Sequence, residues 1–165
     1  MEQKNMNKNL NDNVFRQAAS GDEQILRNLF RDFSEAIKSK DIEKIMSFYT
    51  PDVVAFDIVP PLQFVGRDAF QKSWERFARE MKSVDVHEVQ DLKITVSGDV
   101  AFAHGLVHIV GTTQSGETMD SWMHLTDGFR KINGRWLVAH EQISMPIDMK
   151  SGKARWDLKP EASVH

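Results

Sequence analysis

The sequence predicts an α+β fold in which three helices come first and a curved, mainly antiparallel sheet follows. Apolar residues recur at helical spacing in the first half of the chain, and strand-like runs separated by turn signals fill the second half. With 165 residues, 41% of them hydrophobic, the chain suits one domain and is too short for two. We therefore expect a single domain at 21–146, a flexible polar tail at 1–20 and a carboxy-terminal extension at 147–165.

Three segments carry the helical pattern. The first begins at Asp22 and has one apolar face opposite a charged face. This apolar face consists of Ile25, Leu26, Leu29, Phe30, Phe33 and Ile37. Asp41 stands in the capping position before a short second helix that begins at Ile42. The third helix spans Arg67 to Met81, and its aromatic face consists of Phe70, Trp74 and Phe77.

The first strand is predicted by a β-branched and aromatic run. This run extends from Val53 to Val59, and Pro60 and Pro61 end it. Asp57 lies near its end, and a short second run follows at residues 63–65.

Four long antiparallel strands are expected between Val84 and Met145. Turn signals separate them at 97–99, 115–116 and 133–134, the last being an Asn-Gly pair typical of hairpins. Helices would cover one face of this sheet, which leaves the other face for a partner or water. We therefore expect a homodimer through the open face.

Composition excludes several classes of function. Lysine plus arginine total 21 against 24 for aspartate plus glutamate, and the charges are interspersed, so nucleic-acid binding is not indicated. The absence of cysteine excludes disulfides and cysteine-based zinc sites, and with no signal-peptide pattern or bilayer-spanning stretch we expect a cytoplasmic protein that does not enter membranes. No Walker-type loop, dinucleotide glycine pattern or serine elbow occurs, so we expect no cofactor.

Three stretches of the chain resemble a known family. They are DIEKIMSFYTPDVVAFDIVPPLQFVGRDAF, the hairpin KINGRW and the ending VAHEQISMPIDMKSGKARWDLKP. Together they resemble the SnoaL-like, ketosteroid-isomerase-like branch of the nuclear-transport-factor superfamily, over roughly residues 22–160. The resemblance implies a cone-shaped cystatin-like fold with a small-molecule pocket. Isomerases of this family pair a carboxylate base with a protonated acid in an apolar site.

The resemblance also assigns roles to individual residues. It puts Asp57 at the position of the general base, and it puts Phe33 where the family has a phenolic donor, so that hydroxyl is missing here. Asp127 falls near the second donor, a protonated aspartic acid. His104 and His108 fall at the alternating positions of a central strand that face the pocket, and they could assist Asp57 as catalytic groups. The implied substrate-binding residues are Phe33, Phe56, Trp74, Phe102, Asp127, Phe129 and Glu141.

Two structural questions bear on this site. His104 and His108 lie about 13 Å apart on an extended strand, so they cannot share a metal ion, and we expect no metal site. On the last strand, one of two alternating sets of side chains faces the pocket, and a one-residue change of register would exchange them. The two sets are His140, Gln142 and Ser144, and Ala139, Glu141 and Ile143.

The sequence is thus compatible with three functions, of which the third is structural. The first is a cofactor-independent isomerase or lyase that uses Asp57 as a general base on a small hydrophobic carbonyl compound. The alternative is a non-catalytic module that binds a hydrophobic ligand in the same pocket. The third is a dimerisation domain, whose pocket would be packed shut by Phe70, Trp74 and Phe77.

Overall fold

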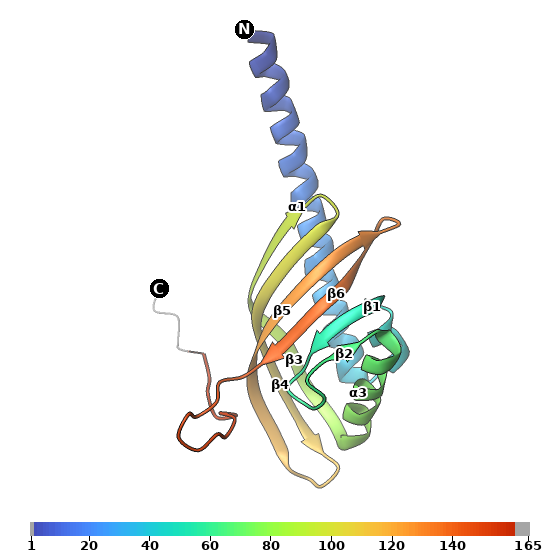
Figure 1. Cartoon of the computed structure of the whole chain (residues 1–165), viewed down its shortest axis with the longest axis vertical. Helices are drawn as coiled ribbons and strands as arrows, with labels where there is room; N and C mark the ends of the chain where they lie inside the picture. Colours follow the sequence, from blue (N-terminus) through green and yellow to red (C-terminus); the bar gives the residue numbers. More distant parts are fainter. Residues whose placement is uncertain (1, 161–165) are drawn as a thin grey trace.

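A computed structural model describes the backbone of residues 2–160 and the side chains of residues 21–160. In chain order the elements are α1 (Glu2–Ser39), α2 (Ile42–Met46), β1 (Tyr49–Phe56), β2 (Phe64–Val65), α3 (Arg67–Glu80), β3 (Met81–Ser97), β4 (Val100–Thr113), β5 (Thr118–Ile132) and β6 (Arg135–Ser144). The strands form one sheet in the order β2-β1-β6-β5-β4-β3, in which only the β1–β6 pair is parallel among the described strands. Figure 1 shows the long strands curving around α1, with α3 beside β1 and β2. The predicted α+β architecture is confirmed.

Helix α1 begins at Glu2, so the helix continues through the segment that the sequence predicts to be a flexible tail. This amino-terminal half extends beyond the sheet (Figure 1). From Asp22 onward the predicted apolar face packs on the sheet, and Leu26, Phe30 and Ile37 are buried. No helix in the described part of the chain is long and apolar enough to span a membrane. The mobility of residues 1–20 and the domain boundaries stay predictions.

The shorter elements follow the local signals in the sequence. The Asp41 carboxylate accepts a hydrogen bond of 2.9 Å from the Lys44 backbone N–H, which confirms the predicted cap of α2. Strand β1 begins at Tyr49, four residues earlier than predicted, and it ends at Phe56. Asp57 therefore follows the strand directly, at the edge of the helix-covered face.

The Asn-Gly signal marks a tight hairpin between β5 and β6. Asn133 and Gly134 have φ values of 50° and 77°, and the flanking Ile132 and Arg135 are paired directly. Positive φ at both central residues is the geometry that favours Asn-Gly in a two-residue turn. The four-strand meander is confirmed.

The side chains of β4 face the opposite sides of the sheet from those predicted, which is a difference of one residue in their alternation. Ala101, Ala103, Val107 and Ile109 are buried on the concave, helix-covered face. The alternate positions, which include His104 and His108, therefore face the other side, because successive side chains of a strand point to opposite faces. Burying two imidazoles among apolar side chains would cost free energy, whereas valine and isoleucine gain from burial.

A β-bulge in β6 changes which of its side chains face inward. Gly128 pairs with His140 but the next residue, Phe129, pairs with Val138, which leaves Ala139 as an extra residue. Before the bulge the even positions Trp136 and Val138 are buried, and after it Glu141 is buried instead. The two alternatives left open by the sequence therefore resolve in favour of Glu141 and Ile143 near the cavity.

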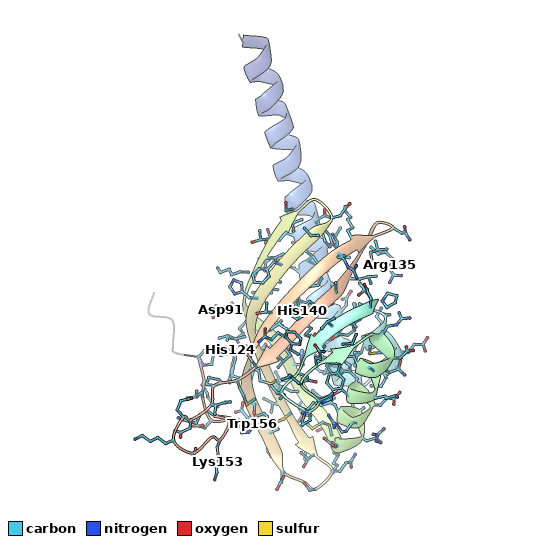
Figure 2. The ribbon with its side chains drawn as sticks, in the orientation of Figure 1. Asp91, His124, Arg135, His140, Lys153 and Trp156 are labelled. Atoms are coloured by element: carbon cyan, nitrogen blue, oxygen red, sulfur yellow. The ribbon has the colours of Figure 1, made fainter. Side chains whose placement is uncertain are left out.

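The carboxy-terminal extension forms a compact loop up to residue 160. A bridge joins Ile147 to Ala154, and the Arg155 N–H donates to the Pro146 carbonyl oxygen at 2.9 Å. The Lys159 ammonium group donates to the Asp120 carboxylate at 2.9 Å and ties the loop to β5. Figure 2 labels Trp156 in this loop, beyond the end of β6.

Candidate acid-lined cavity

A cavity of about 330 Å³ lies between the concave face of the sheet and the helices α1 and α3. Its wall is mostly apolar, with Phe30 from α1, Phe77 from α3 and Val107, Met123 and Leu125 from the sheet. This volume lies in the range that accepts a small organic molecule. The cavity disfavours the third hypothesis, a purely structural domain in which the aromatic residues of α3 would fill the interior.

Asp57 forms part of the cavity wall, as expected from its place at the end of β1. The Ile58 backbone N–H donates to one carboxylate oxygen at 2.7 Å, and the Ser73 hydroxyl donates to the other at 3.4 Å. Burial raises the pKa of Asp57, and these two hydrogen bonds oppose the rise. A carboxylate held in this way is a candidate proton acceptor with a basicity above that of a solvated aspartate.

Two further acids lie in the same wall. Asp127 on β5 and Glu141 on β6 are paired directly, and their exposed fractions are only 3% and 4%. Burial raises the pKa of Glu141 to about 8, and burial together with the nearby Glu141 charge raises the pKa of Asp127 well above its ordinary value. Burial thus favours the protonated form of both acids, the form that can donate a hydrogen bond.

A tyrosine behind the wall completes this acid cluster. The Tyr49 hydroxyl donates to Glu141 Oε2 at 2.7 Å, and the ring lies edge-on to Phe33 at 5.8 Å. Burial raises the Tyr49 pKa well above 10, so its phenol stays protonated. The hydroxyl that the resemblance finds missing at Phe33 thus has a counterpart from β1 in the same region.

The cavity wall contains two buried polar atoms without hydrogen-bond partners among the described residues. They are Asp127 Oδ1 and the indole nitrogen of Trp74. Buried polar atoms are nearly always hydrogen-bonded in folded proteins, so unpartnered ones in a cavity wall indicate where a ligand or water would bind. Both atoms are fully buried, so a ligand oxygen would reach them only after these side chains move.

The aromatic residues expected in the site divide into two groups. Phe33 and Trp74 line the cavity and contact each other edge-to-face at 5.8 Å. Phe129 is buried in the core against Phe30, outside the cavity wall. Phe56 and Phe102 lie on the outer face with exposed fractions of 39% and 48%, outside the wall of this cavity, and their contact with a substrate stays a prediction.

The expected catalytic histidines also lie outside the cavity. His108 stacks on Trp122 at 4.2 Å and contacts Asp120 through Nε2 at 2.9 Å, on the outer face. His104 is exposed beside Phe102 on that face. The side chains of β4 alternate one residue out of step with the prediction, which explains why both histidines lie outside the cavity. We assign neither histidine a role in the cavity. The homodimer expected through this outer face stays a prediction.

Sequence reasoning missed a different histidine. His87 on β3 lines the cavity, and its Nδ1 lies 2.9 Å from the Ser34 hydroxyl of α1. Burial lowers its pKa to about 4, so the ring is neutral at physiological pH. Tyr49 and Arg76 were also missed, because neither lies in a motif, although Tyr49 is the single tyrosine of the sequence. Within the described residues, no three His, Asp or Glu side chains form a group that could hold a metal ion.

A curved sheet with helices on its concave face is the cystatin-like, NTF2-like fold, which solved structures with similar coordinates share. The family model for the SnoaL-like domain matches residues 26–148, and the chain belongs to this family. No curated protein matches the sequence.

Solved structures support this assignment. An NTF2-like protein of unknown function from Pseudomonas putida KT2440 is 34% identical, with a TM-score of 0.78 over 86% of this chain and 99% of its own. A Novosphingobium aromaticivorans protein with the provisional name scytalone dehydratase is 18% identical, with a TM-score of 0.68 over 90% of this chain and 97% of its own. A Streptomyces avermitilis protein with the provisional name dehydratase of the NTF2-like family is also 18% identical, with a TM-score of 0.66 over 76% and 97%. At 18% identity these two show the fold alone.

Proposed function

We propose that this protein is a cofactor-independent isomerase or lyase that transfers a proton on a small hydrophobic carbonyl compound. The observation that supports this proposal is the placement of one carboxylate base candidate and a pair of protonated acids in a single apolar cavity. Groups whose environments give them different protonation states are the usual arrangement for acid and base roles in one site. The provisional dehydratase names of two structural relatives agree with a lyase reaction.

Asp57 acts as the base in the proposed reaction. Its carboxylate accepts a proton from the carbon next to the substrate carbonyl, and the electron pair of that C–H bond moves onto the carbonyl oxygen. The protonated Asp127 donates a hydrogen bond from its unpartnered side to this oxygen, with Glu141 and Tyr49 behind it. Return of the proton to another carbon completes an isomerisation, and its delivery to a departing β-hydroxyl completes the elimination of water.

Hydrogen–deuterium exchange tests the proton transfer without knowledge of the natural product. A panel of cyclic ketones and enones is incubated with the protein in deuterium oxide, and loss of the α-proton signals is followed by NMR. We expect faster exchange of at least one compound with the wild-type protein than with buffer. Asp57→Asn should reduce this rate by about a hundredfold or more, as expected for loss of a positioned base.

The matched control is Asp99→Asn, which removes the same charge in the exposed β3–β4 turn. It should leave the exchange rate unchanged. Equal rates for the wild-type protein and Asp57→Asn on every exchanging compound would contradict the proposal.

The alternative function is a module that binds a hydrophobic ligand without turnover. Phe33 at the position of a phenolic donor favours this alternative, since a binding site does not need an oxyanion donor there. It predicts ligand affinity that survives Asp57→Asn, together with no α-proton exchange in any compound. Comparison of the wild-type protein with Asp57→Asn therefore distinguishes the two functions.

A further inference from the structure

Among residues 21–160, a single cationic side chain lines the wall of the cavity. Arg76 projects from α3, on the same helix as Ser73 and Phe77, which also line the cavity, and it is partly buried. The other charged or titratable groups of the wall are His87, which is neutral, and four acids. These acids are Asp57, Glu80, Asp127 and Glu141.

Arg76 has no ion-pair or hydrogen-bond partner among residues 21–160. The described salt bridges and side-chain hydrogen bonds include the arginines at 27, 31, 130 and 155, and Arg76 is in none of them. A guanidinium has five N–H donors in a fixed fork, and its natural partner is a carboxylate that accepts two of them. A partly buried guanidinium at an apolar wall therefore has unused capacity for binding an anion.

Neither Glu80 nor Asp57, the two acids of the cavity wall outside the Asp127–Glu141 pair, satisfies that capacity. Glu80 is four residues farther along α3 and is exposed, and the two side chains form no ion pair within 4.0 Å. Asp57 receives its hydrogen bonds from Ile58 and Ser73 instead. Burial dominates the pKa of Asp57, and the Arg76 charge is the weakest of the influences on it, so the two do not form a close pair.

We propose that Arg76 binds a carboxylate of the ligand, so that the ligand is an amphipathic acid whose apolar body fills the cavity. Burial favours the protonated form of Asp127 and Glu141, which reduces the repulsion between this acid cluster and such an anion. This inference rests on the proposed function in one respect: it names the chemical class of the compound that occupies the same cavity. A substrate of that class has its carboxylate beside α3 and its carbonyl at the acid cluster.

Cinnamate and cinnamamide test this inference by binding alone. They share one apolar body and differ in charge, and their dissociation constants are measured by isothermal titration calorimetry at neutral pH. The wild-type protein should bind cinnamate at least about tenfold more tightly than cinnamamide, because hydrogen bonds to a charged partner are roughly twice as strong as neutral ones. Arg76→Gln should remove this preference, and Arg76→Lys should retain part of it.

Arg79→Gln is the control, since Arg79 is an exposed cation of the same helix and does not line the cavity. It should leave the preference intact, whereas Glu80→Gln should increase the affinity for cinnamate by removing a competing negative charge. A preference that persists in Arg76→Gln, or binding of neither compound to the wild-type protein, would overturn the inference. Retained preference for cinnamate with no α-proton exchange would instead count against the proposed enzyme and leave the anion site standing.

Discussion

Asp127 and Glu141 lie directly opposite each other on β5 and β6, and both carboxyl groups are buried at the cavity wall. Two acids placed in this way cannot both ionise at low cost, because each would add its charge to a region that already lacks water. The β-bulge at Ala139 accommodates this relationship, since uninterrupted alternation from the inward Val138 would point Glu141 to the outer face. With the bulge, both acids lie on the inner face of the sheet.

The buried acid pair predicts that stability falls as pH rises. The pKa of Glu141 is raised from 4.5 to about 8 in the folded protein. Between these two values the unfolded chain releases the proton while the folded chain keeps it, so the free energy of unfolding decreases with increasing pH and levels off above about 8. Below 4.5 the group is protonated in both states, and its stabilising contribution is fully present.

Glu141→Gln isolates this effect. The amide keeps an acceptor for the Tyr49 hydroxyl and cannot ionise, so the variant should gain stability relative to wild type as pH rises from 4.5 to about 8. The gain should exceed about 1 kcal/mol, since one unit of pKa shift corresponds to about 1.4 kcal/mol. Urea unfolding at several pH values measures it. Parallel pH profiles of the two proteins would show that Glu141 ionises normally in the folded state.

Residue pattern alone predicted the elements of this fold but not the facing of their side chains. The apolar stripe of α1, the Asp41 cap and the Asn133-Gly134 hairpin each reflect local chemistry, and all three are confirmed. The phase of β4 and the bulge in β6 depend on contacts between strands far apart in sequence. A single-residue shift in β4 places His104 and His108 on the outer face, whereas Glu141 lies at the cavity, where the resemblance puts it.

A close approach between β3 and β4 explains a glycine on the concave side of the sheet. A Cβ atom at Gly111 would overlap the backbone oxygen of Ser83 and the methyl group of Met81, where the β3 register is irregular. Because one of these neighbours is backbone, the overlap requires the strands to separate. Gly111→Ala should therefore destabilise the protein by about 1–3 kcal/mol, the usual cost of overpacking.

Gly21 provides the opposite control. It lies in α1 with nothing within 4 Å of an added Cβ, so Gly21→Ala should stabilise the helix by up to about 1 kcal/mol. Thermal unfolding followed by circular dichroism compares the two variants with the wild-type protein. Destabilisation by Gly21→Ala equal to that by Gly111→Ala would show that close approach of the strands is not the cause.

Trp156 places part of the carboxy-terminal extension at the cavity, which predicts a part for the extension in ligand binding. It lines the cavity although it lies beyond the last strand, and its exposed fraction is 47%, so the indole contributes to both the cavity wall and the surface. A large aromatic side chain in this position would bury apolar ligand surface while contributing little to the core. Trp156→Ala should thus weaken binding of an apolar ligand severalfold and leave the melting temperature nearly unchanged.

Cinnamamide is a suitable ligand for this measurement, because it carries no charge and so reports the apolar wall rather than Arg76. Leu158→Ala is the matched control, since Leu158 lies in the same loop with 38% of its surface exposed and does not line the cavity. Both variants remove a partly exposed apolar side chain from the same loop, and only Trp156 lines the cavity, so a difference in dissociation constant between them reports contact with the ligand. If both variants bound cinnamamide as tightly as the wild-type protein, the extension would be a surface loop without a part in the site. If both weakened binding equally, the order of the loop as a whole, and not the indole of Trp156, would control the affinity.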